Sequence, residues 1–219
     1  MKLAIFDLDH TLLAGDSDYA WGQFLARVGA VAREEYEARN RAFYEDYLAG
    51  TLDIDAFLKF SLSPLAAHDP AQLAKWHEQF MMEMIDPMIT PASLELVAKH
   101  REKGHTLMII TATNAFITRP IATRFGIEHL LATEPEFIDG RYTGNYVGTP
   151  TFQAGKVTAL KQWLQNQPQP PEQTWFYSDS RNDIPLLEEV DHPVAVDPDP
   201  YLRAYAESMG WPIISLREP

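Results

Sequence analysis

Two patterns of hydrophobic positions follow one another along the chain. It opens with a short apolar run over residues 2–6, which predicts a strand buried on both faces of a sheet. From about residue 16 to residue 84, hydrophobic residues recur every three or four positions, and this spacing predicts a series of helices. We expect breaks between the helices at Gly29, Gly50-Thr51 and Ser63-Pro64.

After residue 86, short apolar runs alternate with helical spacing. The apolar runs predict strands over 105–111, 174–178, 193–196 and 213–214. The helical segments are expected over 91–103, 114–125, 156–165, 183–189 and 199–209. Asp139-Gly140 lies between apolar flanks and predicts the two-residue turn of a β-hairpin.

The alternation of strands and helices predicts an α/β protein whose mostly parallel sheet has helices on both faces. The expected fold is therefore a Rossmann-like three-layer core. The long helical stretch falls between the first and second strands, so we interpret it as an inserted all-helical cap over residues 16–86. Residues 1–15 and 87–219 would then form the α/β hydrolase core, for which the chain has enough length.

Composition narrows the classes of function. Cysteine is absent, which excludes disulfides, thiolate catalysis and cysteine-ligated zinc. The net charge is −13 at pH 7 and no run rich in lysine and arginine occurs, so we expect no nucleic-acid and no membrane partner. No apolar stretch approaches the roughly 20 residues that span a bilayer. The first residues also lack the apolar middle of a secretion signal, so we expect a cytoplasmic protein whose oligomeric state stays open.

Two carboxylates follow the first predicted strand. Ligands of an open parallel sheet bind beyond the carboxyl ends of its strands, and Asp7 and Asp9 fall there. They are two residues apart, so in an extended segment their side chains point the same way. Crowded carboxylates favour a bound cation, and oxygen ligands suit Mg²⁺. Asp7 is then a candidate nucleophile toward phosphorus, and Asp9 a candidate acid and base. The alternative for both is ordinary turn chemistry.

Groups suited to holding a phosphate are expected at the same edge. Thr111 and Ala112 follow the second long strand and open a helix, where hydroxyls and backbone N–H groups hold an anion. The alternative is an ordinary helix N-cap. Lys156 opens a later helix and is a candidate for neutralising phosphate charge, although a lone lysine in that position is usually solvated.

A second acidic cluster follows the strand over 174–178. Asp179 is a candidate metal ligand, and Asp183 and Asn182 are candidates for orienting water or Lys156 from behind the ligands. The alternative is that Asp179 or Asn182 caps the next helix. Taken together, these groups predict a magnesium-dependent site whose partner is a small phosphorylated metabolite.

These motifs resemble those of the haloacid dehalogenase superfamily along essentially the whole chain. The matching positions are residues 7–12, Thr111, Lys156 and residues 179–183. The resemblance implies an aspartyl-phosphate on Asp7, with Asp9 as acid and base. It also implies Mg²⁺ held by Asp7, the backbone carbonyl of Asp9, and Asp179. One departure is Ser178, where many relatives have glycine.

The predicted cap resembles that of the branch containing phosphoserine phosphatase, and residues 13–22 are similar to bacterial histidinol-phosphatases. Both of those substrates carry an ammonium group, which Asp16 or Asp18 is placed to bind; the alternative is that the two aspartates cap the first cap helix. The resemblance therefore implies a phosphatase for an amino-acid-like phosphate such as phosphoserine or histidinol phosphate. Two alternatives remain: a phosphotransferase that uses the same intermediate, and a regulatory module that binds metal and phosphate with little turnover.

Overall fold

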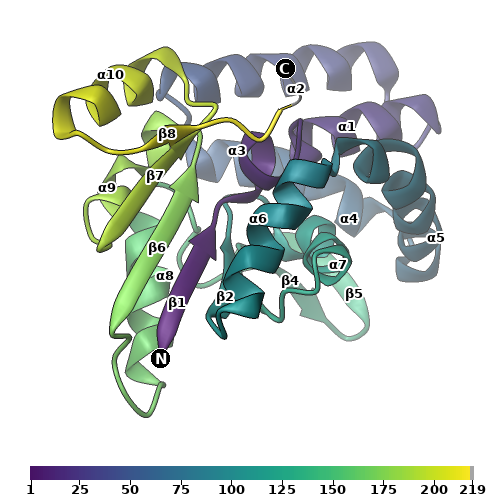
Figure 1. The fold of residues 1–219 in the computed structure, drawn as a ribbon. Coiled ribbons are helices and arrows are strands. Elements are labelled where there is room, and N and C mark those ends of the chain that lie inside the picture. The colour runs from purple at the N-terminus through teal and green to yellow at the C-terminus, as the bar shows by residue number, and fades with distance from the viewer. Residues whose placement is uncertain (218–219) are drawn as a thin grey trace.

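A parallel sheet lies at the centre of the structure, a computed structural model that describes residues 1–217 (Figure 1). Within these residues the six strands run in the order β3 (His129–Leu131), β2 (Thr106–Ile110), β1 (Lys2–Phe6), β6 (Gln173–Ser178), β7 (His192–Val196) and β8 (Ile213–Ile214). Each strand pairs with its neighbour in parallel. Chain order reverses between β1 and β6, and parallel sheets bind ligands at such a point. The predicted α/β class is confirmed.

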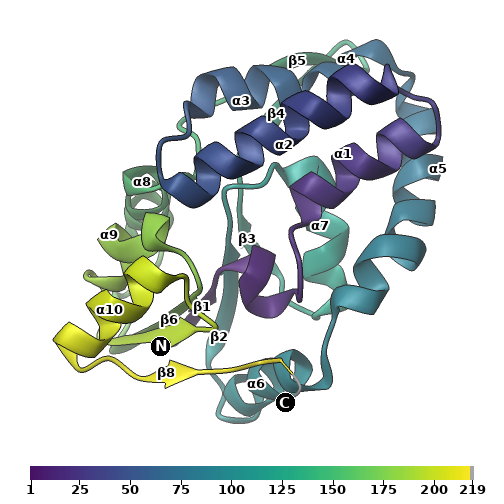
Figure 2. The ribbon, with the colours of Figure 1, turned by 90° about the horizontal axis from the view of Figure 1, so that it is seen from above.

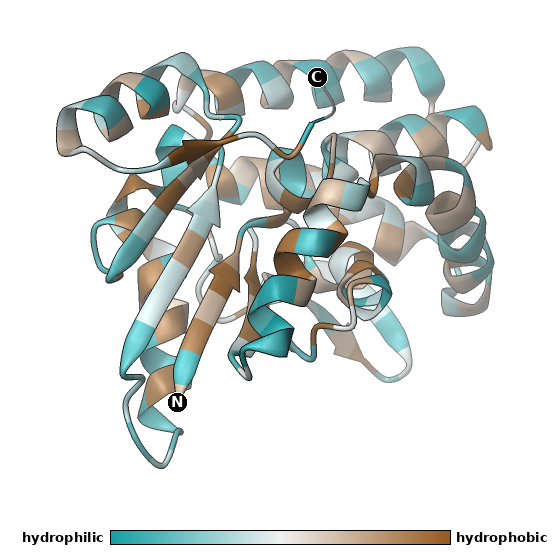
Figure 3. Ribbon diagram, viewed as in Figure 1, coloured by the Kyte–Doolittle hydropathy of each residue, from teal (hydrophilic) through white to brown (hydrophobic). Residues whose placement is uncertain are grey.

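Helices cover both faces of this sheet because its central strand is apolar on both sides. In β1, Ala4 and Phe6 belong to one hydrophobic cluster with α6 (Pro91–Glu102) and α7 (Ala115–Arg124). Leu3 and Ile5 point to the other face, where they join α8 (Ala154–Gln165), α9 (Ile184–Leu187) and α10 (Pro200–Met209). Most of β1 is accordingly coloured as hydrophobic in Figure 3. The three predicted layers are present.

A run of helices, residues 17–88, separates β1 from β2, and we call it the helical insertion. It consists of α1 (Ser17–Arg27), α2 (Arg33–Ala49), α3 (Ile54–Ser61), α4 (Ser63–Ala67), α5 (Pro70–Phe80), η2 (Met81–Ile85) and η3 (Asp86–Met88). Seen from above, α1 and α2 lie side by side (Figure 2). The predicted breaks at Gly29 and Gly50 are confirmed, and Gly50 ends α2 in a left-handed conformation with φ of 74°. At Ser63-Pro64 a separate short helix, α4, begins.

The helical insertion is anchored to the rest of the chain at its base. Leu13 pairs with Ile89 in an antiparallel bridge, so the two connecting segments lie side by side. Trp21 of α1 and Phe80 of α5 are buried in the cluster that also holds Ile117 of α7. These aromatic residues are therefore core, as their helical spacing predicts. Whether the insertion moves as a separate cap stays a prediction.

A hairpin leaves the sheet after β3 and braces the helical insertion. Its strands are β4 (Glu134–Ile138) and β5 (Arg141–Val147), which pair in antiparallel. Asp139 and Gly140 have φ of 50° and 78°, as a two-residue turn of this kind requires, so the predicted hairpin is confirmed. The hydroxyl of Tyr146 donates to Asp55 Oδ1 of α3 at 2.6 Å. The hairpin therefore ties the core to the insertion at a second place.

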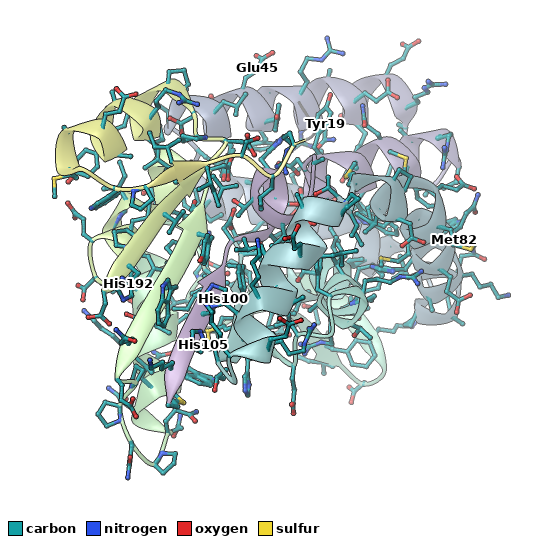
Figure 4. The ribbon with its side chains drawn as sticks, in the orientation of Figure 1. Tyr19, Glu45, Met82, His100, His105 and His192 are labelled. Carbon is teal, nitrogen blue, oxygen red and sulfur yellow. The ribbon has the colours of Figure 1, made fainter. Side chains whose placement is uncertain are left out.

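Histidines line the face of the sheet beside α6 (Figure 4). His100 of α6 is 2.8 Å from His105 through their Nδ1 atoms, and its Nε2 lies 2.8 Å from the hydroxyl of Tyr177. Trp175 stacks against the rings of both His105 and His192. Burial lowers the pKa of His100 to about 4, so this contact between α6 and the sheet depends on a neutral ring.

Two local features differ from the expectations. The helix expected over 183–189 is present but shorter: it is the single turn of α9, which follows a 3₁₀ turn, η4 (Arg181–Asp183), and Pro185 has no N–H with which to continue a helix from η4. The strand β3 was not expected, since it is three residues long and half-buried at an edge. Among residues 1–217, no helix has both the length and the apolar character needed to cross a membrane.

Candidate active site

The chain leaves β1 in a tight turn that buries two carboxylates. The turn η1 (Leu8–Leu12) closes through a bond from the N–H of Leu13 to the carbonyl of Leu8 at 2.9 Å. Asp7 and Asp9 both have extended backbone angles. His10 between Asp9 and the end of the turn has φ of 53°, which bends the chain back. The two carboxylates therefore lie at the switch point of the sheet but bond to different groups.

Asp7 is paired with a buried lysine. Lys156 Nζ donates to Asp7 Oδ1 at 2.7 Å and to Asp183 Oδ2 at 2.8 Å. The exposed fractions of Asp7, Lys156 and Asp183 are 4%, 2% and 2%. The alternative, a solvated lysine at a helix start, does not hold here, and Lys156 is instead paired with Asp183 of the acidic cluster. Burial raises the pKa of Asp7, and the nearby ammonium of Lys156 opposes that rise.

Lys156 reaches this position because its helix starts unusually close to the preceding loop. A Cβ on Gly155 would lie 1.9 Å from the carbonyl oxygen of Pro150, so only glycine fits there. The residue before the helix, Gln153, has φ of 49° and donates through Nε2 to Asn182 Oδ1 at 3.1 Å. These contacts place the first turn of α8 beneath the end of β1.

A hydroxyl links Asp7 to the second acidic cluster. Thr11 Oγ1 lies 3.2 Å from Asp7 Oδ2 and 3.0 Å from Asp179 Oδ1, and it accepts from the N–H of Asp179 at 3.1 Å. Burial, followed by the charges of Asp7 and Asp183, raises the pKa of Asp179 well above its ordinary value. Lys156 bonds to two of these three carboxylates, Asp7 and Asp183, and not to Asp179. Such an excess of buried negative charge, presented by oxygen atoms, fits a hard divalent cation.

No group of three or more metal-binding side chains is arranged as a complete site among the residues that the structure describes. Mg²⁺ does not require one, because it usually binds one or two carboxylates and keeps several waters. Asp7 and Asp179 are therefore the side chains suited to hold it. The carboxylate of Asp183 already accepts hydrogen bonds from Lys156 Nζ at 2.8 Å and from the hydroxyl of Ser178 at 2.7 Å. The serine that departs from the family pattern thus fixes Asp183.

Asp9 has surroundings suited to proton transfer. Its Oδ1 accepts from the N–H of Ser17 at 2.6 Å, and its Oδ2 accepts from the hydroxyl of Thr113 at 2.7 Å. Burial raises the pKa of Asp9 to about 6, and the charge of Asp16 adds to the rise. A carboxyl group with such a pKa exchanges its proton near neutral pH, as an acid and base must.

The phosphate-binding candidates lie at the end of β2. Thr111 and Ala112 line the same cavity as Asp7 and Asp9. The capping role belongs to another residue, since Asn114 Oδ1 accepts from the N–H of Ile117 at 3.3 Å at the start of α7. Thr111 is therefore not needed as the cap.

Asn182, Asp16 and Asp18 differ in their contacts. Asn182 makes no hydrogen bond to Asp7 or Asp179 among the described residues; it donates through Nδ2 to the carbonyl of Tyr47 in α2 at 3.1 Å and so links the core to the helical insertion. Asp16 does cap α1, because its Oδ1 accepts from the N–H of Tyr19 at 2.8 Å. Asp18 does not cap the helix. Asp16 and Asp18 both line the cavity above Asp9.

Sequence patterns alone do not indicate several residues of the site. Thr11 lies in the first motif and Thr113 in the second, but the motifs do not show that Thr11 contacts Asp7 and Asp179 or that Thr113 contacts Asp9. Arg217 gave no signal: its guanidinium donates to the carbonyls of His10, Thr11 and Leu13 from the far end of the chain. It thereby holds the η1 turn, and no local pattern predicts such a contact.

Known proteins resemble this chain in sequence and in fold. Residues 4–188 match the family of haloacid dehalogenase-like hydrolases. A histidinol-phosphatase of Neisseria meningitidis serogroup C (strain 8013) is 48% identical over 220 residues, which cover 99% of each chain. The crystal structure of a protein of unknown function from Bordetella pertussis Tohama I superposes with a TM-score of 0.94 at 47% identity, covering 99% of each chain.

A structure described as a phospho-aspartyl intermediate analogue of phosphoserine phosphatase superposes with a TM-score of 0.72. It covers 99% of this chain and 94% of the other, at 18% identity, and so supports the fold alone. The family match spans most of the chain and includes Asp7, Thr111, Lys156 and Asp183. The chain therefore belongs to the haloacid dehalogenase-like hydrolase family.

Proposed function

We propose that this protein is a magnesium-dependent phosphatase that hydrolyses a small phosphate monoester through a covalent intermediate on Asp7. The observation that carries the proposal is that two buried carboxylates at one edge of the sheet, Asp7 and Asp9, have different bonding partners. Asp7 is paired with Lys156 at 2.7 Å, whereas Asp9 is separately bonded and its pKa is raised to about 6. One carboxylate is thus suited to attack, and the other to proton transfer.

The proposed reaction has two steps. An oxygen of Asp7 attacks phosphorus and the ester P–O bond breaks, while Asp9 gives its proton to the leaving alcohol oxygen. Asp9 then takes a proton from water, the water oxygen attacks phosphorus, and the bond to Asp7 breaks to release phosphate. Thr111 and the backbone of Ala112 bind the phosphoryl oxygens, and Lys156 offsets their negative charge.

The residues suited to hold Mg²⁺ are Asp7, Asp179 and the backbone carbonyl of Asp9. When bound, Mg²⁺ neutralises charge on the phosphate and on the acidic cluster. Thr11 holds the side chains of Asp7 and Asp179 next to each other, since its hydroxyl lies 3.2 Å from Asp7 Oδ2 and 3.0 Å from Asp179 Oδ1. Asp183 keeps Lys156 in place from the other side.

The relative named histidinol-phosphatase, with 48% identity over nearly the whole length, supports an amine-bearing phosphate as the substrate. Histidinol phosphate and phosphoserine are the two candidates, and both have their phosphate on a primary alcohol. Phosphoserine phosphatase shares the fold at 18% identity, which says less about the substrate.

The test is release of phosphate from p-nitrophenyl phosphate and from histidinol phosphate with Mg²⁺ present. Asp7→Asn should abolish turnover, whereas Asp191→Asn, on the exposed loop before β7, should leave it unchanged. Turnover by Asp7→Asn at the native rate would contradict the proposal. A new phosphate ester formed with added methanol would identify a phosphotransferase instead. Binding of Mg²⁺ and beryllofluoride without any phosphate release would identify a regulatory module.

A further inference from the structure

The charged side chains that line the cavity over Asp7 and Asp9 are all acidic. Besides those two carboxylates, it is lined by Asp16 and Asp18 and, among the residues that the structure describes, by no lysine, arginine or histidine. Apart from Tyr19 and residues 111–113, its other walls come from α2, α3 and the loop between them, and they include Phe43, Tyr44, Tyr47 and Phe57. The part of the cavity away from the phosphate end is therefore acidic on one side and aromatic on the other.

Asp18 is the carboxylate in this cavity that the protein leaves unsatisfied. Its exposed fraction is 9%, and its Oδ1 is buried without a hydrogen-bond partner. It is not needed to start α1, because Asp16 performs that role. A buried carboxylate oxygen without a partner is costly, and the structure around it offers no cation. Burial and the charges of Asp16 and Asp9 accordingly raise the pKa of Asp18 well above its ordinary value.

The two cations that bond to residues of the site are already engaged. Lys156 bonds to Asp7 and Asp183, and the half-buried Arg217 bonds to the carbonyls of His10, Thr11 and Leu13. Neither is among the residues that line the cavity. A negatively charged group on the substrate, other than its phosphate, would therefore meet carboxylates and no counter-charge.

We propose that Asp18 binds the ammonium group of the substrate, and that the cavity selects phosphate esters of cationic amino alcohols over phosphorylated amino acids. The proposal rests on the proposed phosphatase function and specifies its substrate class. The ammonium supplies the cationic partner that Asp18 lacks. The aromatic faces of Phe43 and Phe57 suit a flat or cationic side group. Phosphoserine differs by its carboxylate, for which the described lining of this cavity has no cationic side chain.

The experiment compares three substrates: histidinol phosphate, phosphoserine and the amine-free ester phenyl phosphate. The native enzyme should have a much higher kcat/KM for histidinol phosphate than for phosphoserine. Asp18→Asn keeps the shape of the side chain but removes its charge. It should lower kcat/KM for histidinol phosphate by about 10- to 100-fold, mainly through KM, and lower it far less for phenyl phosphate. Asp18→Glu keeps the charge and should retain part of the preference.

The outcomes separate the two proposals. If the native enzyme hydrolyses none of the three esters, the proposed function itself fails. If the enzyme is active but Asp18→Asn slows all three esters equally, or none, Asp18 does not bind the ammonium group. A native preference for phosphoserine would overturn the claim about the carboxylate. Thermal unfolding of ligand-free Asp18→Asn gives a further check: its Tm should not fall, because the substitution breaks no hydrogen bond of Asp18 Oδ1.

Discussion

Replacing Lys156 with methionine tests how far the buried carboxylates depend on one cation. In the native chain Nζ bonds to Asp7 Oδ1 at 2.7 Å and to Asp183 Oδ2 at 2.8 Å. Methionine keeps most of the apolar length of the side chain but leaves both carboxylates without their partner. We therefore expect the substitution to lower both the free energy of unfolding and the rate of ester hydrolysis.

The size of the loss follows from burial. Removing one partner of a buried ion pair costs about 3–5 kcal/mol. For a chain of this length, 1 kcal/mol corresponds to about 2–4 °C, so Tm should fall by about 6–20 °C. Without the lysine, the pKa values of Asp7 and Asp183 rise further and the folded state binds more protons than the unfolded chain. Stability of the variant therefore falls as pH rises, and its deficit is larger at about pH 8 than at about pH 5.

The measurement is thermal unfolding followed by circular dichroism at both pH values, with Lys161→Met as the matched control. Lys161 lies on the same helix, and its ion pair with Glu189 at 3.0 Å is exposed, so breaking that pair should have little effect. If Lys156→Met has the same Tm as the control, the buried pairs do not stabilise the fold. If its deficit is larger at the acidic pH, the sign of the charge argument is wrong.

Three other changes test separate parts of the structure. Gly155→Ala should lower Tm and activity together, because the added Cβ lies 1.9 Å from the carbonyl oxygen of Pro150; overpacking costs about 1–3 kcal/mol, which calorimetry resolves. Arg217→Ala should lower kcat with little change in KM, because the η1 turn loses its donor to three carbonyls, and added guanidinium should restore part of the rate; an unchanged kcat would contradict this. His100 has a pKa of about 4 against an ordinary 6.5, so the unfolded chain takes up its proton first and stability falls as pH is lowered through that range. Unfolding scans of His100→Gln should show a smaller fall.

Much of the fold could be predicted because the core elements have strong local patterns. The apolar run of β1, the hairpin turn at Asp139-Gly140 and the glycine at the end of α2 each follow from residues within a few positions. The order of strands and helices then restricts the topology to a parallel sheet with helices on both faces. The edge strand β3 could not be predicted, because three half-buried residues show no hydrophobic periodicity.

The sequence indicates several residues that the fold brings to one edge of the sheet, but it does not indicate their contacts. Asp7, Thr111, Lys156 and Asp179 lie at the ends of elements that the sheet brings together. Their partners depend on tertiary packing, which brings residues from distant parts of the chain into contact. The burial of Lys156 depends on the close approach at Gly155, and the hold on the η1 turn depends on Arg217.

The lining of the cavity above Asp9 is the part of the site that the sequence predicts least. Asp16 and Asp18 look equivalent in the sequence, since both precede or open the same helix. The structure separates them: Asp16 bonds to the backbone of Tyr19, and Asp18 Oδ1 has no partner. Such a difference depends on which way each side chain faces relative to α2, and the helical spacing alone does not determine this.

The central claim is that Asp7 carries the phosphoryl group during turnover. Its most direct test is to quench the enzyme with acid during hydrolysis of p-nitrophenyl phosphate with Mg²⁺, reduce it with borohydride and sequence the peptides by mass spectrometry. An aspartyl-phosphate is reduced to homoserine, so the account predicts homoserine at position 7 in samples quenched during turnover and aspartate there without substrate. Homoserine at another aspartate, or none at any position while the enzyme turns over with a burst of p-nitrophenol, would contradict it.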